Sequence, residues 1–268
     1  PQDIVSKYPI RVAPQVLIWD NESYLDGVDI APDAFYKRLA NSKSLPSSAQ
    51  VSTGSFDSLF KEIRAEGRDI LAILVSEKLS GTLGSAIKVK QALGDEPIEI
   101  INSHTVASAL ALIVLETAKA ADQGAGLAEC KALAEHLAQN TGVVFAVNTL
   151  EFLHRGGRIG GASRFIGSAL NIKPILEVTN GRIEPLERIR TRHKSISRMI
   201  EIVTDRVGDK QPVQLASLHA NAEAEGNQLI IEAKARLGGE VHLVCELSPV
   251  VGVHVGPGTV GLAYMAGY

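Results

Sequence analysis

Two hydroxyl side chains flank a glycine at positions 80–82, in a stretch that could bind an anion. Ser80, Gly81 and Thr82 follow an apolar run at residues 70–75 that predicts a buried strand, and they precede a predicted helix over residues 82–93. Free N–H groups and the positive end of the helix dipole meet at such a junction, so Ser80 and Thr82 could donate hydrogen bonds to a carboxylate. The residues leave open the alternative that Ser80 only caps the helix.

A histidine stands just before a glycine-rich turn near the end of the sequence. His254 precedes the run Gly256-Pro257-Gly258-Thr259-Val260-Gly261, whose spacing matches the dinucleotide-binding fingerprint. That fingerprint needs a strand–turn–helix unit and an acidic residue about 20 positions later, and the residues up to Tyr268 supply neither. We therefore predict a tight turn at Gly256 and Gly258, in which the backbone closely approaches another group. On sequence grounds alone His254 is either structural or functional.

Basic residues gather in two places. Arg155 and Arg158 lie in the glycine-rich segment 155–161, and Arg190 and Arg192 lie in the basic run 188–194. Such a run is usually a solvated face with weak ion pairs. The alternative is a docking patch for an acidic or phosphorylated partner. The seven histidines are scattered, so no metal site is predicted.

The composition is that of a globular protein with an ample core. Hydrophobic residues make up 45% of the 268 positions and charged residues 21%, with a net charge of −3. This charge and the 4% aromatic content argue against nucleic-acid binding. The first residues lack the basic and apolar regions of a signal peptide, and the apolar segment 106–115 is too short to span a bilayer. We expect a cytoplasmic protein without stable membrane insertion.

Strand-like and helix-like segments alternate up to about residue 147. The predicted strands cover residues 10–19, 70–75, 98–101 and 143–147, and the predicted helices cover residues 32–40, 56–65, 82–93, 105–121 and 127–140. Alternation of this kind predicts a parallel sheet with helices on both faces. Ser47 and Ser48 lie outside these elements, where serines are usually turn or cap residues, so the pattern alone does not single them out.

The pattern changes after the glycine-rich segment, so we predict a domain boundary near Gly161. Asn180-Gly181 separates two apolar segments and predicts a two-residue hairpin turn. The strands expected in this part cover residues 174–179, 182–190, 213–219 and 240–246, and the helices cover residues 195–207 and 222–237. A hairpin combined with strand–helix–strand units predicts a mixed sheet with helices on one face.

Taken together, these stretches resemble the DegV family in order and spacing. The matching segments are residues 26–30, 45–50, 79–82, 148–153, 155–161, 170–176, 190–192 and 248–254 with the glycine turn that follows. The resemblance runs from about Tyr8 to Ala263. Each motif is short, and their common order makes the match specific.

The resemblance implies an α/β fold with two domains. It implies a Rossmann-like α/β/α domain at residues 1–161 and a second domain at residues 162–268, with a mixed sheet and helices on one face. A long-chain fatty acid is expected between the two. The resemblance implies that Ser48, Ser80, Thr82 and His254 bind the carboxylate, and that the backbone at Gly81, Gly256 and Gly258 lines the site.

Some members of the family present this carboxylate to a separate kinase subunit. The resemblance therefore implies an ATP-dependent, dihydroxyacetone-kinase-like partner that makes the acyl phosphate. We expect Arg155, Arg158, Arg190 and Arg192 to contribute to the docking of this partner, because they are long cations in glycine-rich or exposed settings. The protein itself is expected to be a lipid-binding protein with no cofactor and no catalytic residues.

This sequence departs from the family pattern at two points. The family usually opens with a short strand ending in a Thr-Asp-Ser motif, and this sequence starts after it, so we expect the first sheet to lack that strand. The family commonly has Thr where this sequence has Ser48, and Ser where it has Ala49. Ser48 keeps the hydroxyl that the site needs.

Two other classes of protein remain as alternatives. One is an acyl hydrolase or transferase in which Ser80 is the nucleophile and His254 its base, which would also need a group that orients His254 and an oxyanion hole. The other is a lipid-sensing transcription regulator. The net charge and the missing helix-turn-helix pattern argue against the regulator.

Overall fold

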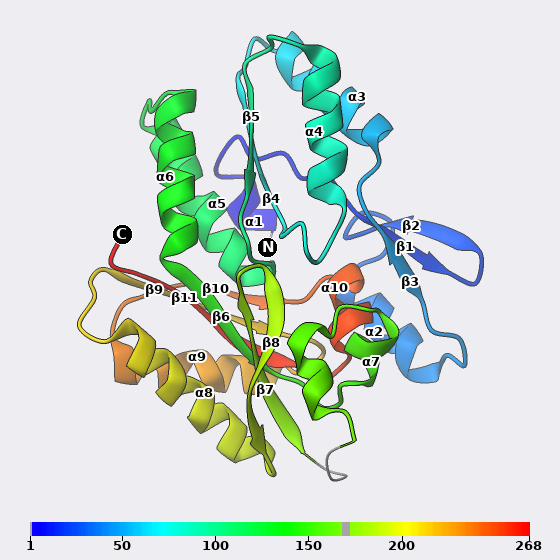
Figure 1. The fold of residues 1–268 in the computed structure, drawn as a ribbon, viewed down its shortest axis with the longest axis vertical. Coiled ribbons are helices and arrows are strands. Elements are labelled where there is room, and N and C mark those ends of the chain that lie inside the picture. The colour runs from blue at the N-terminus through cyan, green and yellow to red at the C-terminus, as the bar shows by residue number, and fades with distance from the viewer. Residues whose placement is uncertain (1, 168–171) are drawn as a thin grey trace.

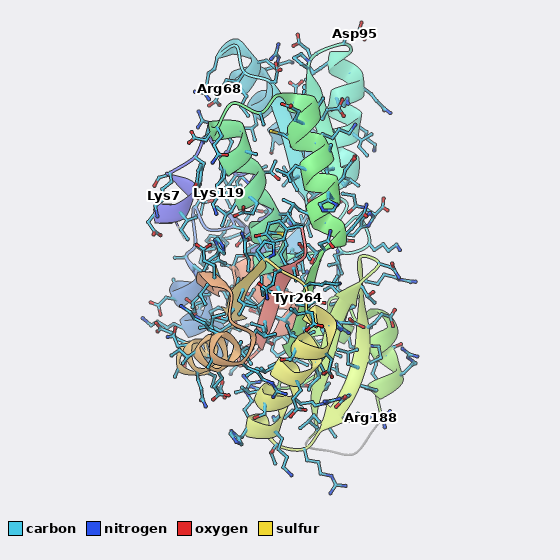
Figure 2. All side chains as sticks on the ribbon, turned by 90° about the vertical axis from the view of Figure 1, so that its left-hand side faces the viewer. Lys7, Arg68, Asp95, Lys119, Arg188 and Tyr264 are labelled. Atoms are coloured by element: carbon cyan, nitrogen blue, oxygen red, sulfur yellow. The ribbon has the colours of Figure 1, made fainter. Side chains whose placement is uncertain are left out.

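The computed structural model describes residues 2–167 and 172–268, and these form two layered α/β units stacked along the longest axis (Figure 1). Leu170 and Asn171 of the 170–176 motif lie outside the described residues. Arg68 and Asp95 mark one end of the molecule, and Arg188 marks the other (Figure 2). The α/β fold class is confirmed.

The first unit is built on a parallel pair of strands, β4 (Ile70–Leu74) and β5 (Ile98–Asn102). Alternate side chains of β4 enter different cores, since Ile70 and Ala72 pack in one cluster and Leu71 and Ile73 pack against another. Helices cover both faces, as the alternating pattern predicts. One face carries α3 (Thr53–Ala65) and α4 (Thr82–Leu93), and the other carries α5 (Ala107–Asp122) and α6 (Leu127–Gln139).

A small antiparallel sheet lies beside this pair, with the strand order β2-β1-β3. Its strands are β1 (Val16–Trp19), β2 (Glu22–Leu25) and β3 (Ser47–Ala49). Trp19 packs edge-on against Phe35 of α2 (Pro32–Asn41), which covers the inner face of the sheet. The predicted strand at residues 10–19 is therefore shorter and lies outside the parallel pair. The helix α1 (Gln2–Val5) opens the described chain.

The second unit is a six-stranded mixed sheet with the order β10-β9-β11-β6-β7-β8. Its strands are β6 (Thr141–Ala146), β7 (Lys173–Thr179), β8 (Arg182–Ile189), β9 (Val213–His219), β10 (Glu240–Glu246) and β11 (Val260–Ala266). The helices α8 (Arg192–Val207) and α9 (Glu223–Leu237) cover one face, and α5 packs on the other. Three short helices lie between strands of this sheet: α7 (Glu151–Arg155) and the 3-10 helix η1 (Gly160–Phe165) between β6 and β7, and α10 (Pro249–Val255) between β10 and β11.

The structure corrects the position of the predicted strand at residues 143–147. We expected it in the parallel sheet, but β6 lies in the six-stranded sheet, antiparallel to both β7 and β11. Val143 and Phe145 pack on the α5 side, and Val144 and Ala146 pack on the α8 side. A strand buried on both faces has the same apolar sequence in either kind of sheet, so its periodicity could not identify its neighbours. The division at Gly161 stays a prediction.

The predicted hairpin turn is confirmed, and it links the two units. Asn180 and Gly181 have φ values of +48° and +76°, as the mirror-image type I turn requires. Ser76 and Lys78, which follow β4, donate hydrogen bonds to the carbonyl oxygens of Gly181 (2.8 Å) and Asn180 (2.9 Å). In Figure 1 the tip of the β7–β8 hairpin accordingly reaches the loops below β4 and β5.

Across residues 2–167 and 172–268, the helices are all too short or too polar to cross a membrane. The same part of the chain contains no group of three or more histidine, cysteine, aspartate or glutamate side chains that could hold a metal ion.

Candidate functional site

A cavity of about 230 Å³ lies where the small sheet, α7 and α10 meet. Its wall contains both apolar and polar side chains. The lining residues are Leu39, Leu45, Pro46, Ser47, Ser48, Phe152, Arg155, Gly156, Arg158, Val253 and His254. A pocket with an apolar wall and a few convergent polar groups suits an amphipathic ligand.

The structure brings Ser48 and His254 together in this cavity, although 206 positions separate them. The distance between Ser48 Oγ and His254 Nε2 is 2.7 Å. Ser48 pairs with the buried Leu17 across the β1–β3 ladder, so its side chain points to the interior of the molecule. His254 lies in the last turn of α10, just before the glycine turn.

Burial keeps the His254 imidazole neutral. Desolvation, assisted by the positive charge of Arg158, lowers the pKa of His254 to about 4. Its second ring nitrogen, Nδ1, has no hydrogen-bond partner among the described residues and lies against Gly156, where a Cβ atom would be 2.2 Å away. A neutral imidazole can donate one hydrogen bond through Nε2. The site therefore offers a hydroxyl and an imidazole as polar groups.

Ser80 and Thr82 are not among the residues that line the cavity. Thr82 is 3% exposed, and its Oγ1 atom accepts a hydrogen bond from the Val51 amide (3.3 Å). Ser80 Oγ lies 2.9 Å from Thr82 Oγ1 and accepts from the Thr82 amide at 3.3 Å. Ser80 thus satisfies the first N–H group of α4, whose N-cap residue is Gly81. It is hydrogen-bonded to Thr82, whereas His254 is paired with Ser48.

Two contacts bring the Ser80 loop close to the cavity. Gln50, just after β3, crosses Gly81 and donates to Ser85 Oγ (2.8 Å), and a Cβ atom on Gly81 would lie 1.8 Å from the Gln50 side chain. Arg158, which lines the cavity, donates to the Leu79 carbonyl oxygen (3.0 Å). Gly81 is therefore required for close packing between β3 and α4.

The glycine turn after His254 is as tight as predicted. Gly256 and Gly258 have φ values of +76° and +79°. A Cβ atom at Gly256 would lie 2.3 Å from the ring of Phe152, and one at Gly258 would lie 1.8 Å from the Asn148 amide. The backbone therefore approaches Phe152 of α7, which lines the cavity, and Asn148, which precedes α7.

The four arginines fall into two pairs. Arg158 and Arg192 are partly buried and form hydrogen bonds within the protein. Arg158 also donates to the Gly156 carbonyl oxygen (2.7 Å). Arg192 donates to the Glu225 carboxylate (2.9 Å) and to the Gly258 carbonyl oxygen. Arg155 and Arg190 are exposed. The ion pair between Arg155 and Glu151 is a solvated surface contact.

Sequence reasoning assigned Arg158 to docking and missed its place in the cavity wall. It also missed Gly156, whose missing side chain makes room for His254. The signal that could have found both was the glycine-rich segment itself, because adjacent glycines often mark a close approach of two backbones. The apolar wall residues Leu39, Leu45 and Phe152 carry no signal of their own in the sequence.

The depressed pKa of His254 predicts a loss of stability in mild acid. The unfolded chain takes up a proton near pH 6.5, whereas folded His254 does so only near pH 4. Stability should therefore be unaffected above pH 6.5 and fall by up to about 3 kcal/mol between pH 6.5 and 4. Urea unfolding measures the free energy of unfolding of the wild type and of His254→Asn at each pH. This free energy should fall less steeply with decreasing pH in the variant.

Burial also lowers the pKa values of His219 and His242. Both residues are present in both proteins, so their contributions to the pH dependence of stability cancel in the comparison. Between pH 7.5 and 8.5 the difference in free energy of unfolding between the wild type and His254→Asn should be constant. If the free energies of unfolding of the two proteins changed in parallel down to pH 4, His254 would not be protected from protonation in the folded protein.

The fold and the cavity define a class: an α/β protein of two layered units, with a neutral histidine–serine pair beside an apolar wall. Residues 1–267 match the model of the DegV family of uncharacterised proteins. A DegV domain-containing protein of Clostridium perfringens is 35% identical over 98% of this chain and 94% of its own length. The chain belongs to the DegV family.

Solved structures of similar proteins support the same assignment. A DegV family protein from Thermus thermophilus, described for its fatty acid binding, matches with a TM-score of 0.93 and 29% identity over 99% of this chain and 95% of that one. DegV of Bacillus subtilis, described as a fatty acid binding protein, matches with a TM-score of 0.87 and 29% identity, with the same coverage of both chains.

Proposed function

We propose that this protein binds a long-chain fatty acid, with the carboxylate at the Ser48–His254 pair and the tail along the apolar wall of the cavity. The observation that carries the proposal is the contact of 2.7 Å between these two groups beside Leu39, Phe152 and Val253. The similarity to fatty-acid-binding proteins of the same family supports it. Ser80 and Thr82 are proposed to complete the site when the ligand is bound.

The energetics fit a ligand with one charged end. A tail of about 16 carbons releases on the order of 10 kcal/mol of gross burial energy, at roughly 0.8 kcal/mol per CH₂. Ordering and association costs remove a large part of this. A buried carboxylate must be met by donors because an unpaired charge is very costly. The tail would thus provide affinity, and the hydroxyl and imidazole groups would fix the position of the carboxylate.

The cavity suits the head of such a ligand better than its whole length. Its volume of about 230 Å³ is below the roughly 300–1,000 Å³ of most ligand pockets. A second hollow, of about 470 Å³, lies on the other side of α7 and includes Leu150 and Ile166 in its wall. We propose that the tail displaces apolar side chains of the wall as it enters.

The test is to identify the ligand. Protein purified without added lipid should release a fatty acid on organic extraction, detected by mass spectrometry, and delipidated protein should bind palmitate more tightly than hexadecanol. Absence of extracted lipid, together with no binding of palmitate or oleate, would refute the proposal. Rapid covalent labelling by a serine-directed probe would favour the acyl hydrolase instead.

The geometry gives less support to an acyl hydrolase or transferase. In that alternative Ser80 is the nucleophile, but the hydroxyl within reach of His254 is that of Ser48. A histidine acting as a base is normally oriented by a third group, and His254 Nδ1 has no such partner in the described part of the chain.

We further propose that the filled site is presented to a separate ATP-dependent kinase subunit, of the dihydroxyacetone-kinase-like type. Arg155 and Arg190 are the favoured docking residues because both side chains are exposed. Arg158 and Arg192 already bond to groups of the protein itself, so their charges are less free to meet a partner. Arg155 also lines the cavity in which the carboxylate is proposed to bind.

A further inference from the structure

The helix that carries His254 is capped by a residue far away in the sequence. Asp26 accepts a hydrogen bond from Ser248 Oγ (2.7 Å) through one carboxylate oxygen and one from the Val250 amide (3.3 Å) through the other. Ser248 is the N-cap residue of α10, and its own side chain makes no capping bond. Pro249 has no amide hydrogen, so Val250 provides the first N–H group of the helix. Asp26 therefore caps the N-terminus of α10, although it lies outside the helix.

Asp26 is itself fixed to the small sheet. It directly follows β2, and its amide donates to the Gln15 carbonyl (2.9 Å) just before β1. A backbone bond from Gly27 to Ile30 (3.2 Å) closes the loop behind it. Strand β1 also pairs with β3, where Leu17 lies opposite Ser48. The sheet that supplies Ser48 therefore also holds the carboxylate that caps α10.

A second contact holds α10 against α2. The Tyr36 hydroxyl, on a side chain that is 2% exposed, donates to the Leu247 carbonyl (3.1 Å) just before the helix. Gly252 lets the helix approach closely, since a Cβ atom there would lie 2.6 Å from the Tyr36 hydroxyl and 2.8 Å from Phe35. Asp26 and Tyr36 thus fix the start of α10, and the packing at Gly252 fixes its middle.

We propose that Asp26 is a positioning residue for the carboxylate site, because it links α10, which carries His254, to the small sheet that carries Ser48. The helix has seven residues, about 10 Å at 1.5 Å per residue. His254 lies one and a half turns from the capped end, so a tilt at Val250 displaces the imidazole from Ser48. The inference rests on the proposed function for its effect on ligand, but its effect on His254 does not depend on any ligand.

The chain supplies a matched control three residues away. Asp29 lies in the same loop, and its carboxylate accepts from the Leu25 amide (2.7 Å), a contact that stays within the loop. Asp26→Asn and Asp29→Asn each remove one charge from this loop, but only the first weakens the link to α10. Ser248→Ala serves as a second, milder variant, because it removes one of the two donors and leaves the Asp26 backbone unchanged.

The first measurement is a double-mutant cycle on palmitate affinity. Asp26→Asn should weaken palmitate binding about tenfold, and hexadecanol binding far less, because only the acid uses the Ser48–His254 pair. In a His254→Ala background Asp26→Asn should cause no further loss, since residues acting through one group are not additive. Asp29→Asn should leave both ligands unchanged. Equal losses for acid and alcohol, or a full tenfold loss in the His254→Ala background, would overturn the proposal.

The second measurement is an NMR titration of the His254 imidazole in the protein without ligand, with the signal assigned from His254→Ala. If α10 tilts, the ring gains water, and its pKa should rise from about 4 toward the ordinary value of 6.5. An unchanged titration in folded Asp26→Asn and in Ser248→Ala would refute the positioning role even if fatty acid binds. Failure of the wild type to bind fatty acid would instead refute the proposed function and leave this titration as the test of Asp26.

Discussion

Gly256→Ala is expected to lower the free energy of unfolding by about 2–6 kcal/mol. The backbone there has φ +76° and ψ 164°, a region that is essentially restricted to glycine and costs other residues about 1–3 kcal/mol. The new Cβ atom would also lie 2.3 Å from the Phe152 ring, and overpacking of this kind costs about 1–3 kcal/mol more. Equilibrium unfolding in urea measures the sum. Because Phe152 lines the cavity, palmitate affinity should fall as well.

Gly238→Ala is the matched control. Gly238 also ends a helix with a positive φ (+68°, ψ −148°), but a Cβ atom there would meet nothing within 4 Å. The loss of stability in Gly238→Ala should therefore be limited to the backbone cost of about 1–3 kcal/mol, and palmitate affinity should be unchanged. Equal losses of stability in the two variants would show that Phe152 yields freely and that the close contact is unimportant.

Local signals in the sequence were enough to predict much of the second unit. Strands β9 and β10 begin and end at the predicted residues, and the Asn180-Gly181 turn has the predicted conformation. These features depend on neighbouring residues. A turn that needs two positive φ values selects Asn-Gly, and a short run rich in apolar and β-branched residues predicts a strand.

Pairings between distant strands could not be predicted in this way. Strand β11 was not expected, because Gly261, Ala263 and Ala266 are poor strand formers on propensity. Packing explains the glycine, since a Cβ atom at Gly261 would lie 2.7 Å from Phe145 Cβ on β6. The central place of β11, between β9 and β6, is a tertiary property that no local pattern contains.

The candidate site shows the same limit. Spacing alone drew attention to Ser80, whose hydroxyl accepts a hydrogen bond from the Thr82 amide, and passed over Ser48 as a turn residue. The resemblance to DegV proteins added Ser48, but only the fold shows that it contacts His254. The environment of His254 depends on the segment with Gly156 and Arg158, on Ser48 of β3 and on α10, which come from separate parts of the chain. Burial and orientation of this kind are set by assembly of the units.

Ser48→Ala is expected to weaken palmitate binding by roughly tenfold to a hundredfold. A hydrogen bond to a charged group contributes about 1.5–3 kcal/mol, and each 1.4 kcal/mol is a factor of about ten in affinity. The variant also leaves His254 Nε2 without its partner at 2.7 Å. Hexadecanol has the same tail without the charge, so its affinity should fall much less. Ser80→Ala should show the same preference if Ser80 joins the carboxylate site on binding.

Ser52→Ala separates binding from stability. Ser52 caps α3 by accepting a hydrogen bond from the Ser55 amide (3.0 Å), and its loss should cost about 1 kcal/mol of stability without changing the ratio of acid to alcohol affinity. Isothermal titration of each folded variant with palmitate and with hexadecanol measures that ratio directly. If Ser48→Ala and Ser52→Ala changed the ratio equally, or not at all, the Ser48 hydroxyl would have no part in holding the carboxylate, and His254 would have to bind it without Ser48.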